Sequence, residues 1–260
     1  SKAPDPHDLL GTRTFLHPVA FSGGVFEQRI GGWAGAPQSI YSDHFVHNAP
    51  HEGPIGYKLE ATPMHPGLAA VLMGGYGKGL AERFQNYPNT QMMLALLRDG
   101  FHPESTGGNV ILNVDGSPLL NYSMSDYVLA GFKQALLTMA EVQFAAGAKK
   151  VMPLHEQATD YYTSWAQAKA AISAYEMKSY YVGGGSAHIM GGCRMGGTEQ
   201  QGVVRPDGVH WQLSNLSVHD GSLFPTSIGA NPQLSIYGLT NRLATGLAKR
   251  LSGKDVALAA

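Results

Sequence analysis

The sequence predicts a mixed α and β fold, with an antiparallel sheet and helices in the middle of the chain and two ends that belong to another domain. Three observations predict it. Short apolar runs separated by glycine and proline turns fill residues 19–186, a clear hairpin signal lies among them, and the two ends differ from this middle. A length of 260 residues, with 43% hydrophobic and 14% charged side chains, is enough to bury a core.

The first third of the chain predicts a loop followed by several strands. Residues 1–18 are broken by prolines and by Gly11, so they are expected to form a loop that leads into a strand. Strands are expected at residues 19–30, 38–46, 57–61 and 91–98, with a turn at 31–37, a loop at 49–54 and a helical stretch at 67–83. The strand at 91–98 is strongly apolar, which indicates a central position.

Two units in the middle of the chain have the clearest local signals. Residues 109–114 and 119–122 flank Asp115-Gly116, which is typical of a hairpin with a type I′ turn. Ser125 is expected to cap a helix that runs to about Ala146 and stops at Gly147. Its inner face is expected to contain Leu129, Phe132, Leu136, Met139 and Val142 or Gln143. Residues 151–187 are mixed, with a helix near 161–172.

The last third combines a glycine-rich loop with a strand, a turn and a helix. Residues 183–197 are so rich in glycine that the backbone is expected to pass close to another group there, and His188 lies in the middle. Residues 216–218 can form a buried strand, and Asp220-Gly221 a turn. Asn231 as N-cap and Pro232 as first helical residue predict a helix to about Leu251. Its apolar positions are Leu234, Ile236, Leu239, Leu243, Leu247 and Leu251.

These two segments are expected to converge on one point. The start of a helix presents unpaired backbone N–H groups and a partial positive charge, and here it follows a histidine-bearing glycine loop. That arrangement suits a flat, electron-accepting ring that becomes anionic.

The motifs of this region resemble a known family. They are His188-x-x-Gly191-x-Cys193-Arg194-Met195-Gly196, Val203-Val204, Val218-x-Asp220-Gly221-Ser222-x-Phe224-Pro225-Thr226-Ser227 and Gly229-x-Asn231-Pro232. In this order they resemble the C-terminal half of the glucose-methanol-choline oxidoreductases, which are FAD-dependent alcohol oxidases and dehydrogenases. The chain departs from the family at Gly192, where threonine is usual, and at Ile189, where proline is common.

The resemblance implies a division into three parts. Residues 1–18 would leave an FAD-binding domain of Rossmann type, 19–186 would form a substrate-binding domain, and 187–260 would carry the catalytic loop and return to the FAD-binding domain. The chain has no G-x-G-x-x-G after a strand, and the closest match, at residues 75–79, lacks the last glycine. An N-terminal FAD-binding chain or fragment is therefore the expected partner. Cleavage, separate genes and a partial polypeptide are all open explanations.

The resemblance also assigns roles to individual residues. His188 would take the proton of the alcohol hydroxyl, because a neutral imidazole accepts a proton near physiological pH. Asn231, at a position where some members have a second histidine, would hold the substrate oxygen, cap the helix, or do both. Cofactor contacts are expected from Asp220, Gly221, Asn231, Pro232 and Gln233. Arg194 is expected to tie the loop to backbone carbonyls or a carboxylate, and Cys193 to be a small packed residue.

The substrate class is indicated only by composition and by local resemblance. Methionine tolerates flexible apolar ligands, and the middle domain contains Met64, Met73, Met92 and Met93 together with Trp33, Tyr41 and Phe45. Such residues are also ordinary core residues. The segments GGWAGAPQSIYSDHF and ATPMHPGLAA resemble bacterial members that act on long-chain or otherwise hydrophobic alcohols. Whether oxygen, a quinone or a cytochrome reoxidises the flavin is open.

Composition excludes several other partners. A net charge of -1 with no basic cluster gives no attraction for nucleic acid. No apolar run reaches the roughly 18 residues that span a bilayer, and the first residues do not have the form of a signal peptide. The one cysteine cannot form an internal disulfide. These observations favour a cytoplasmic or peripherally membrane-associated protein.

Two hydrolase hypotheses and one non-catalytic hypothesis compete with the oxidoreductase. His44, His47 and His51 have spacings that could bind a metal, but Pro50 breaks the helix that would align them. Residues 184–188 resemble the nucleophile elbow of serine hydrolases, except that His188 replaces the last glycine. A non-catalytic interaction module would explain the missing nucleotide motif, but it would not explain two intact catalytic motifs.

Overall fold

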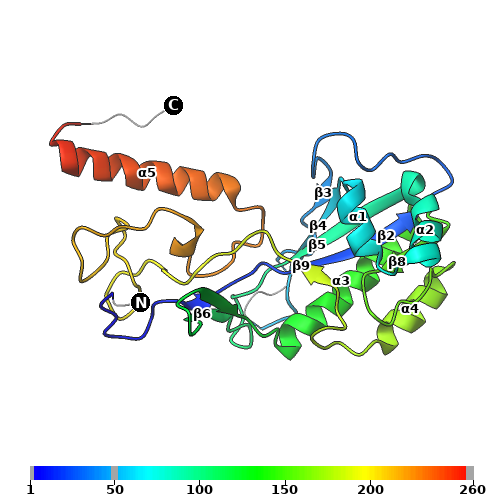
Figure 1. Ribbon diagram of the computed structural model, residues 1–260, viewed down its shortest axis with the longest axis horizontal. Coiled ribbons are helices and arrows are strands. Elements are labelled where there is room, and N and C mark those ends of the chain that lie inside the picture. Colours follow the sequence, from blue (N-terminus) through cyan, green and yellow to red (C-terminus); the bar gives the residue numbers. More distant parts are fainter. Residues whose placement is uncertain (1–2, 48–51, 256–260) are drawn as a thin grey trace. The chain divides into compact units, whose positions relative to one another are not determined.

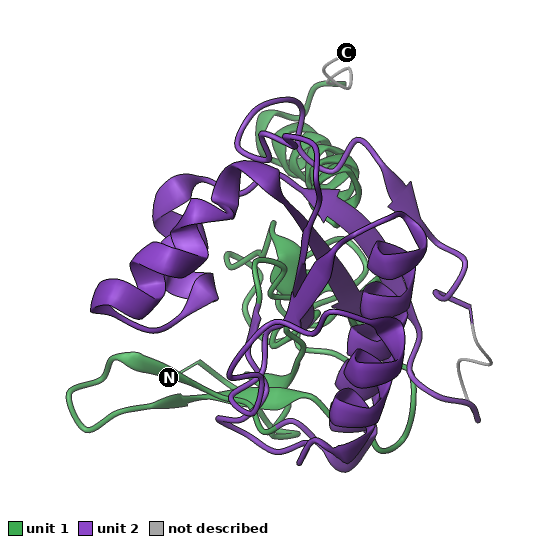
Figure 2. Cartoon of the chain, turned by 90° about the vertical axis from the view of Figure 1, so that its right-hand side faces the viewer, with its two compact units in different colours: residues 1–17, 99–123, 186–260 green, residues 18–98, 124–185 purple. Residues whose placement is uncertain are grey.

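A computed structural model of the chain describes residues 3–47 and 52–255 (Figure 1). The backbone divides into two compact units (Figure 2). Unit 1 contains Ser1–His17, Asp99–Ser123 and Ser186–Ala260, and unit 2 contains Pro18–Arg98 and Met124–Gly185. Residues 99–123, which the sequence analysis places in the middle domain, belong to unit 1 because they form a sheet with the N-terminal segment. The roles in substrate and cofactor binding that the sequence assigns to residues 1–18, 19–186 and 187–260 stay predictions.

Unit 2 is built on an antiparallel sheet. Among the described residues it has six strands, in the order β3-β4-β5-β2-β8, with β9 paired to β2. They are β2 (Val19–Val25), β3 (Tyr41–Ser42), β4 (Tyr57–Thr62), β5 (Thr90–Leu97), β8 (Lys150–Pro153) and β9 (Gly184–Gly185). Every pairing is antiparallel. The predicted antiparallel sheet is confirmed, and the apolar strand β5 lies between β4 and β2 as its composition indicates.

One face of this sheet packs against helix α3 (Asp126–Ala145). The helix begins where the sequence predicts, because the Ser125 hydroxyl accepts a hydrogen bond from the Val128 amide, and it stops before Gly147, which has φ +98°. Its buried side chains meet Ala95 and Leu97 of β5, and α4 (Trp165–Ala174) joins the same core. This core, which contains most of the buried aliphatic and aromatic side chains of unit 2, fixes the sheet.

The alternative left open in α3 is decided by a polar contact. Gln143 is buried and Val142 is 38% exposed. The amide oxygen of Gln143 accepts from the Ser22 hydroxyl at 2.7 Å, and its nitrogen donates to the Ser22 carbonyl at 3.0 Å. A buried amide with its hydrogen bonds satisfied is tolerated in a core, so hydrophobicity alone does not identify the inward position.

The helical stretch predicted at 67–83 is two helices. They are α1 (Pro66–Met73) and α2 (Gly77–Gln85), followed by the short 3₁₀ helix η1 (Tyr87–Asn89). Gly74 and Gly75 separate them, with φ of +63° and +80°. Left-handed backbone ends a right-handed helix, so the glycines break the pattern. Met64, Met73 and Met92 form a small cluster here.

Three other predicted boundaries differ from the structure. Strand β2 ends at Val25 and not at residue 30, and of the strand predicted at 38–46 only Tyr41–Ser42 forms. The left-handed backbone of Gln38 (φ +46°) and the turn closed by the Val46 amide on the Asp43 carbonyl keep this stretch from being extended. The helix predicted near 161–172 is α4, which starts after its cap Ser164. Part of the predicted loop 49–54 lies outside the described residues.

Unit 1 has a three-stranded antiparallel sheet among its described residues, in the order β1-β6-β7. The strands are β1 (Thr12–Thr14), β6 (Gly108–Leu112) and β7 (Pro118–Asn121). The predicted hairpin forms, but its turn is not type I′, because Asp115 lacks a positive φ and only Gly116 (φ +82°) has one. The Gly116 amide donates to the Asn113 carbonyl, which closes a type I turn followed by a left-handed glycine.

The remaining elements of unit 1 are the 3₁₀ helix η2 (Gly221–Leu223) and the C-terminal helix α5 (Gln233–Ser252). Residues 216–218 pair with residues 208–210 through a single bridge and not through a longer strand. Of the apolar positions of α5, Leu243 is buried, whereas Leu234 is 83% and Leu251 78% exposed. Across residues 3–47 and 52–255, no helix combines the length and hydrophobicity that crossing a bilayer requires.

Candidate active site

The glycine-rich loop that contains His188 is held on one side by the N-terminal segment of unit 1. The Phe15 amide donates to the Met190 carbonyl at 2.7 Å, and the Met190 amide donates back to Phe15 at 2.9 Å. Gly191, the next residue of the loop, has φ +82°, and a Cβ on it would lie 2.0 Å from the carbonyl oxygen of Arg13. Only glycine fits this position, as the composition of the loop predicts.

On its other side the loop contacts the turn at η2 and the start of α5. The Cys193 amide donates to the Ser222 carbonyl at 3.1 Å. A Cβ on Gly221 would lie 3.1 Å from the carbonyl oxygen of Ile189 and 3.2 Å from the Cδ1 atom of Ile236, in the first turn of α5. The loop, the turn and the helix start therefore meet at one place, which is the convergence that the sequence predicts.

His188 is half-buried and forms a pair with a second histidine. Its Nδ1 atom lies 3.0 Å from Nδ1 of His17, and the two ring centroids are 5.2 Å apart. His17 is completely buried. His17 was not predicted from the sequence, where its only local signal is a histidine directly before Pro18, at the end of the segment expected to leave the FAD-binding domain.

Asp99 anchors the backbone that carries His17. Its carboxylate accepts from the amides of Leu16 and His17, both at 3.1 Å, and from the hydroxyl of Tyr122 at 3.0 Å. Asp99 is completely buried, and burial raises the pKa of its carboxyl, which the hydrogen bonds from Tyr122 and the two amides partly offset. Burial and the nearby Asp99 raise the pKa of Tyr122, so its hydroxyl stays a donor.

The same aspartate reaches the loop before α5. The Ser227 hydroxyl donates to the Asp99 main-chain carbonyl at 2.7 Å, and Ser227 is completely buried. Asp99, Tyr122 and Ser227 therefore join His17 as structural elements of the site that the sequence analysis did not identify. No local pattern marks them, because their partners lie 23 to 128 positions away in the sequence.

The structure shifts the start of α5 by one residue from the prediction. Pro232 is the N-cap, with no side-chain cap hydrogen bond, and Gln233 is the first helical residue. The expected N-cap role of Asn231 is thus wrong, because Asn231 lies one position further out, where its side chain is exposed. Its proposed catalytic role stays a prediction.

The other predicted cofactor residues flank this helix start. Asp220 caps η2 through its carboxylate, which accepts from the Ser222 amide at 2.8 Å, and Gly221 lies against the His188 loop. Pro232 is buried and Gln233 is exposed. The first turn of α5 has neither an acidic residue nor a side-chain cap, so its backbone N–H groups and partial positive charge suit an anionic group. This is the property that an FAD site requires here.

Unit 1 also has a cavity of about 660 Å³ on the glycine-loop side. Gly11, Gly191, Gly192, Cys193 and Ser222 line it, together with residues 110–112 of β6 and, from the N-terminal segment, Asp5 and Asp8. Glycines leave the backbone accessible, which is how proteins bring main-chain groups close to a large cofactor. The accessible glycine backbone and the uncapped start of α5 fit a bound flavin nucleotide.

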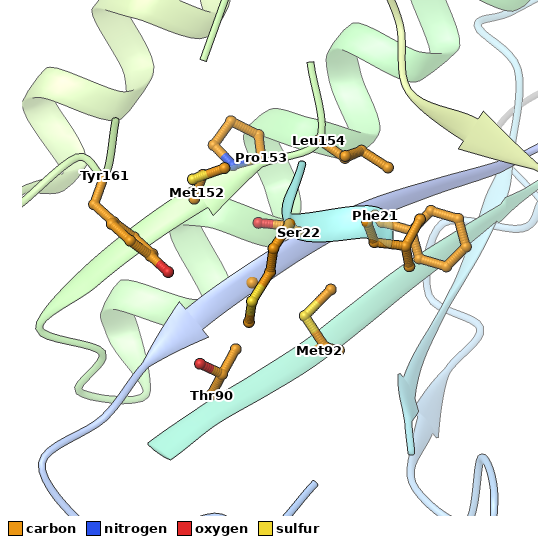
Figure 3. A pocket seen from close by; sticks show the side chains of 11 residues that line it. Phe21, Ser22, Thr90, Met92, Met152, Pro153, Leu154 and Tyr161 are labelled. Atoms are coloured by element: carbon orange, nitrogen blue, oxygen red, sulfur yellow. The ribbon is translucent and has the colours of Figure 1, made fainter. Parts of the chain in front are cut away.

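Unit 2 has a separate, apolar cavity (Figure 3). It measures about 30 Å³ and is lined by Phe21, Met73, Met92 and Met152, among others. A larger cavity of about 290 Å³ shares part of this lining, including Met73 and Met152. Of the other residues considered for substrate contact, Met64 is in a core cluster, Met93 and Phe45 pack against the α3 core, and Trp33 stacks on Tyr87.

Comparison with known families decides the class of the chain. Residues 103–240, more than half of the chain, match the family described as GMC oxidoreductase. The chain belongs to this family. The expected resemblance to the glucose-methanol-choline oxidoreductases is confirmed, and the matched range contains both the histidine loop and the start of α5.

Relatives in the GMC family cover most of the chain. Long-chain-alcohol oxidase FAO1 of Arabidopsis thaliana is 27% identical over 253 residues, 90% of this chain and 32% of the relative. An uncharacterised GMC-type oxidoreductase of Mycobacterium tuberculosis is 26% identical over 95% of this chain and 37% of the relative. The chain thus spans about a third of the length of the curated relatives it matches.

Solved structures show the same fold. An R554K variant of formate oxidase from Aspergillus oryzae RIB40, described in a study of FAD modification, has a TM-score of 0.62 with 14% identity, covering 95% of this chain and 48% of that one. Pyridoxine 4-oxidase has a TM-score of 0.57 with 13% identity, covering 94% of this chain and 44% of that one. The mixed α and β fold class is confirmed.

The structure also shows the surroundings of Arg194 and Cys193 in the glycine-rich loop. Arg194 donates to the Gln201 carbonyl and to the Thr12 hydroxyl, both at 3.0 Å, which confirms a structural tie. Cys193 is half-buried, and burial raises the pKa of its thiol, so the thiolate form is disfavoured.

The alternative hypotheses gain no support. His51 lies outside the described residues, and within residues 3–47 and 52–255 no group of three His, Cys, Asp or Glu side chains is placed to hold a metal. The Ser186 hydroxyl donates to the Leu16 carbonyl, so this residue braces the loop and does not form a nucleophile elbow.

Proposed function

We propose that the chain is the C-terminal part of an FAD-dependent enzyme that oxidises an alcohol to an aldehyde or ketone. The observation that carries the proposal is the position of His188, on a glycine loop that packs against Gly221 and the first turn of α5. The names of the long-chain-alcohol oxidases among its relatives support the same reaction class.

FAD is the cofactor, and when bound it accepts the hydride from the carbinol carbon. In this chain, Asp220, Gly221, Asn231, Pro232 and Gln233 would hold it, since they surround the uncapped start of α5. A helix N-terminus stabilises nearby negative charge by about 0.3 to 2 kcal/mol, which favours an anionic reduced ring.

The chain's own contribution to the chemistry is acid–base catalysis. His188 takes the hydroxyl proton, because a neutral imidazole is a base near physiological pH and its second ring nitrogen is already paired with His17. Asn231, exposed at the start of α5, holds the substrate oxygen through its amide. Removal of the proton then favours loss of the hydride from the carbon.

The substrate is a hydrophobic alcohol. Phe21, Met92 and Met152 line the small apolar cavity of unit 2 (Figure 3), and Met73 and Met152 also line the adjoining cavity of about 290 Å³. Flexible methionine side chains suit an apolar chain of variable shape. The relatives' names support this choice, because several are long-chain-alcohol oxidases.

The nucleotide-binding fingerprint comes from an N-terminal FAD-binding part, on the same polypeptide or on a second one. Unit 1 exposes apolar side chains on β6, among them Ile111 at 40% and Leu112 at 55%, and on α5, where Leu234 is 83% exposed. These exposed apolar side chains offer contact area to a further part of the protein. The long-chain-alcohol oxidases align with this chain over about a third of their own length, which leaves room for a further part of this kind.

An anaerobic absorption experiment tests the proposal. The protein carrying this chain, purified with its FAD-binding part, should show an oxidised flavin spectrum that a series of primary alcohols of increasing chain length bleaches, with the rate rising for longer chains. A flavin that no alcohol reduces would reject alcohol oxidation. A protein that holds no flavin with every part present would favour a non-catalytic interaction module.

A further inference from the structure

The contact between His17 and His188 restricts the protonation of both rings. Their two Nδ1 atoms are 3.0 Å apart, a hydrogen-bond distance. A neutral imidazole has one N–H donor and one acceptor nitrogen. Two Nδ1 atoms that share a hydrogen bond must therefore carry a single proton between them, so one ring donates and the other accepts.

The two possible arrangements have opposite chemical consequences. If His188 donates from Nδ1, its Nε2 atom carries the lone pair and can accept a proton. If His17 donates from Nδ1, then His188 has its own proton on Nε2 and cannot act as a base there. The tautomer of His17 thus decides whether His188 is a base.

The geometry of the pair is fixed by its surroundings. Asp99 holds the amides of Leu16 and His17 at 3.1 Å, and His17 has a left-handed backbone with φ +52°. On the other side, the Ser186 hydroxyl donates to the Leu16 carbonyl. The two main-chain hydrogen bonds between Phe15 and Met190 set the distance between the N-terminal segment and the His188 loop. A non-glycine residue in this backbone region is strained, so the surrounding contacts must stabilise it.

We propose that His17 is a positioning residue that accepts the Nδ1–H of His188 and so keeps His188 in the tautomer whose Nε2 is basic. His17 then carries its own proton on Nε2. This inference rests on the proposed function, in which the proton of the alcohol hydroxyl moves to Nε2 of His188. The resulting imidazolium keeps its Nδ1–H hydrogen bond to His17, which stabilises its charge. In serine proteases an aspartate has the corresponding orienting role, and loss of the correct tautomer there costs about 10⁴ in rate.

Nuclear magnetic resonance tests the tautomer directly. The FAD-loaded protein is labelled with ¹⁵N-histidine, and two-bond ¹H–¹⁵N spectra report which ring nitrogen carries the proton. The signals of His188 are identified by their loss in His188→Gln. The proposal expects a protonated Nδ1 and an unprotonated Nε2 in the resting enzyme. A protonated Nε2 on His188 would overturn it, whatever the enzyme's activity.

Two substitutions of His17 separate positioning from structural support. Asparagine tolerates the left-handed backbone and offers Oδ1 as an acceptor where His17 has Nδ1. The rate of flavin reduction in His17→Asn should therefore stay within about fivefold of the wild-type rate. His17→Leu offers no acceptor and should slow flavin reduction roughly 10- to 1000-fold with little change in KM, while the proton of His188 moves to Nε2. A folded His17→Leu enzyme with wild-type rate and tautomer would overturn the proposal.

The tautomer of His188 and the oxidation of alcohol are measured separately, so either result can fail alone. If no alcohol reduces the flavin, the proposed function fails, while the tautomer of His188 is still measured in the same sample. If His17→Leu does not fold, the wild-type spectrum alone decides the proposal.

Discussion

At the scale of the residue, the candidate site depends on one histidine in the middle of a glycine loop. His188 is half-buried, its amide lies 3.4 Å from the Ser186 hydroxyl, and its ring contacts His17. A histidine that only braced the loop would need these contacts for stability. A catalytic base needs them for orientation, so only the effect of its removal separates the two roles.

Replacing His188 by alanine should slow flavin reduction by about 10² to 10⁴-fold, or about 3 to 5 kcal/mol in barrier, because the base is lost while the cofactor contacts stay. FAD content should be unchanged. Stopped-flow reduction by alcohol measures the effect, with the exposed His47→Ala as control for the loss of an imidazole elsewhere. A flavin-replete His188→Ala enzyme within about threefold of wild type would remove His188 from the mechanism.

At the scale of the element, the glycine loop holds the site together because it forms main-chain contacts on both sides. It pairs with Phe15 through Met190 and with Ser222 through Cys193. Gly191 lies between these contacts, where a side chain would collide with the Arg13 carbonyl. Residues 186–197 of the loop are therefore held by main-chain contacts, although they form only isolated bridges and no strand.

Replacing Gly191 by alanine should destabilise the protein by roughly 3 kcal/mol or more, since it combines a left-handed backbone with a backbone collision. Gly31→Ala is the matched control, because Gly31 also has a positive φ (+63°) but no atom within 4 Å of the place that a Cβ would take, so about 1 kcal/mol is expected there. Chemical denaturation measures both. Equal losses for the two variants would show that packing around Gly191 is unimportant.

At the scale of the whole molecule, the stability of unit 2 should depend on pH through a buried histidine outside the candidate site. His155 is 6% exposed, stacks on Tyr175 with ring centroids 4.2 Å apart, and accepts the Gln157 amide at Nδ1. Burial lowers the pKa of His155; the backbone hydrogen bond with Glu176 and the charge of Glu156 partly oppose this, and Lys133 acts in the same direction as burial. The unfolded chain then binds more protons than the folded one near pH 6.

The free energy of unfolding should therefore decrease as the pH falls through about 6.5, the ordinary histidine value, because the unfolded state takes up the proton first. His155→Phe keeps an aromatic ring on Tyr175, and His155→Gln keeps a polar atom, but neither titrates. Both variants should lose less stability than wild type between pH 7.5 and 5.5 in chemical denaturation. Identical slopes in all three proteins would contradict the assignment.

Much of the fold was predictable because its signals are local. Ser125 and Gly147 bracket α3, the apolar run of β5 predicts a central strand, and the motifs from His188 to Pro232 indicate the family. Errors arose where backbone conformation overrode the hydrophobic pattern, as at Gln38 and at the Asp115-Gly116 turn. Local sequence contains little information on such dihedral choices, since they depend on neighbouring strands.

The sequence by itself thus determined the family, the sheet with its main helix, and His188 as the candidate base. Only the tertiary structure decided what surrounds that base, because unit 1 is assembled from three separate segments and each of them contributes to the site. His17, Asp99 and His188 come from residues 1–17, 99–123 and 186–260 in turn. Residues so far apart become neighbours through sheet pairing and burial, and no spacing rule along a chain encodes that proximity.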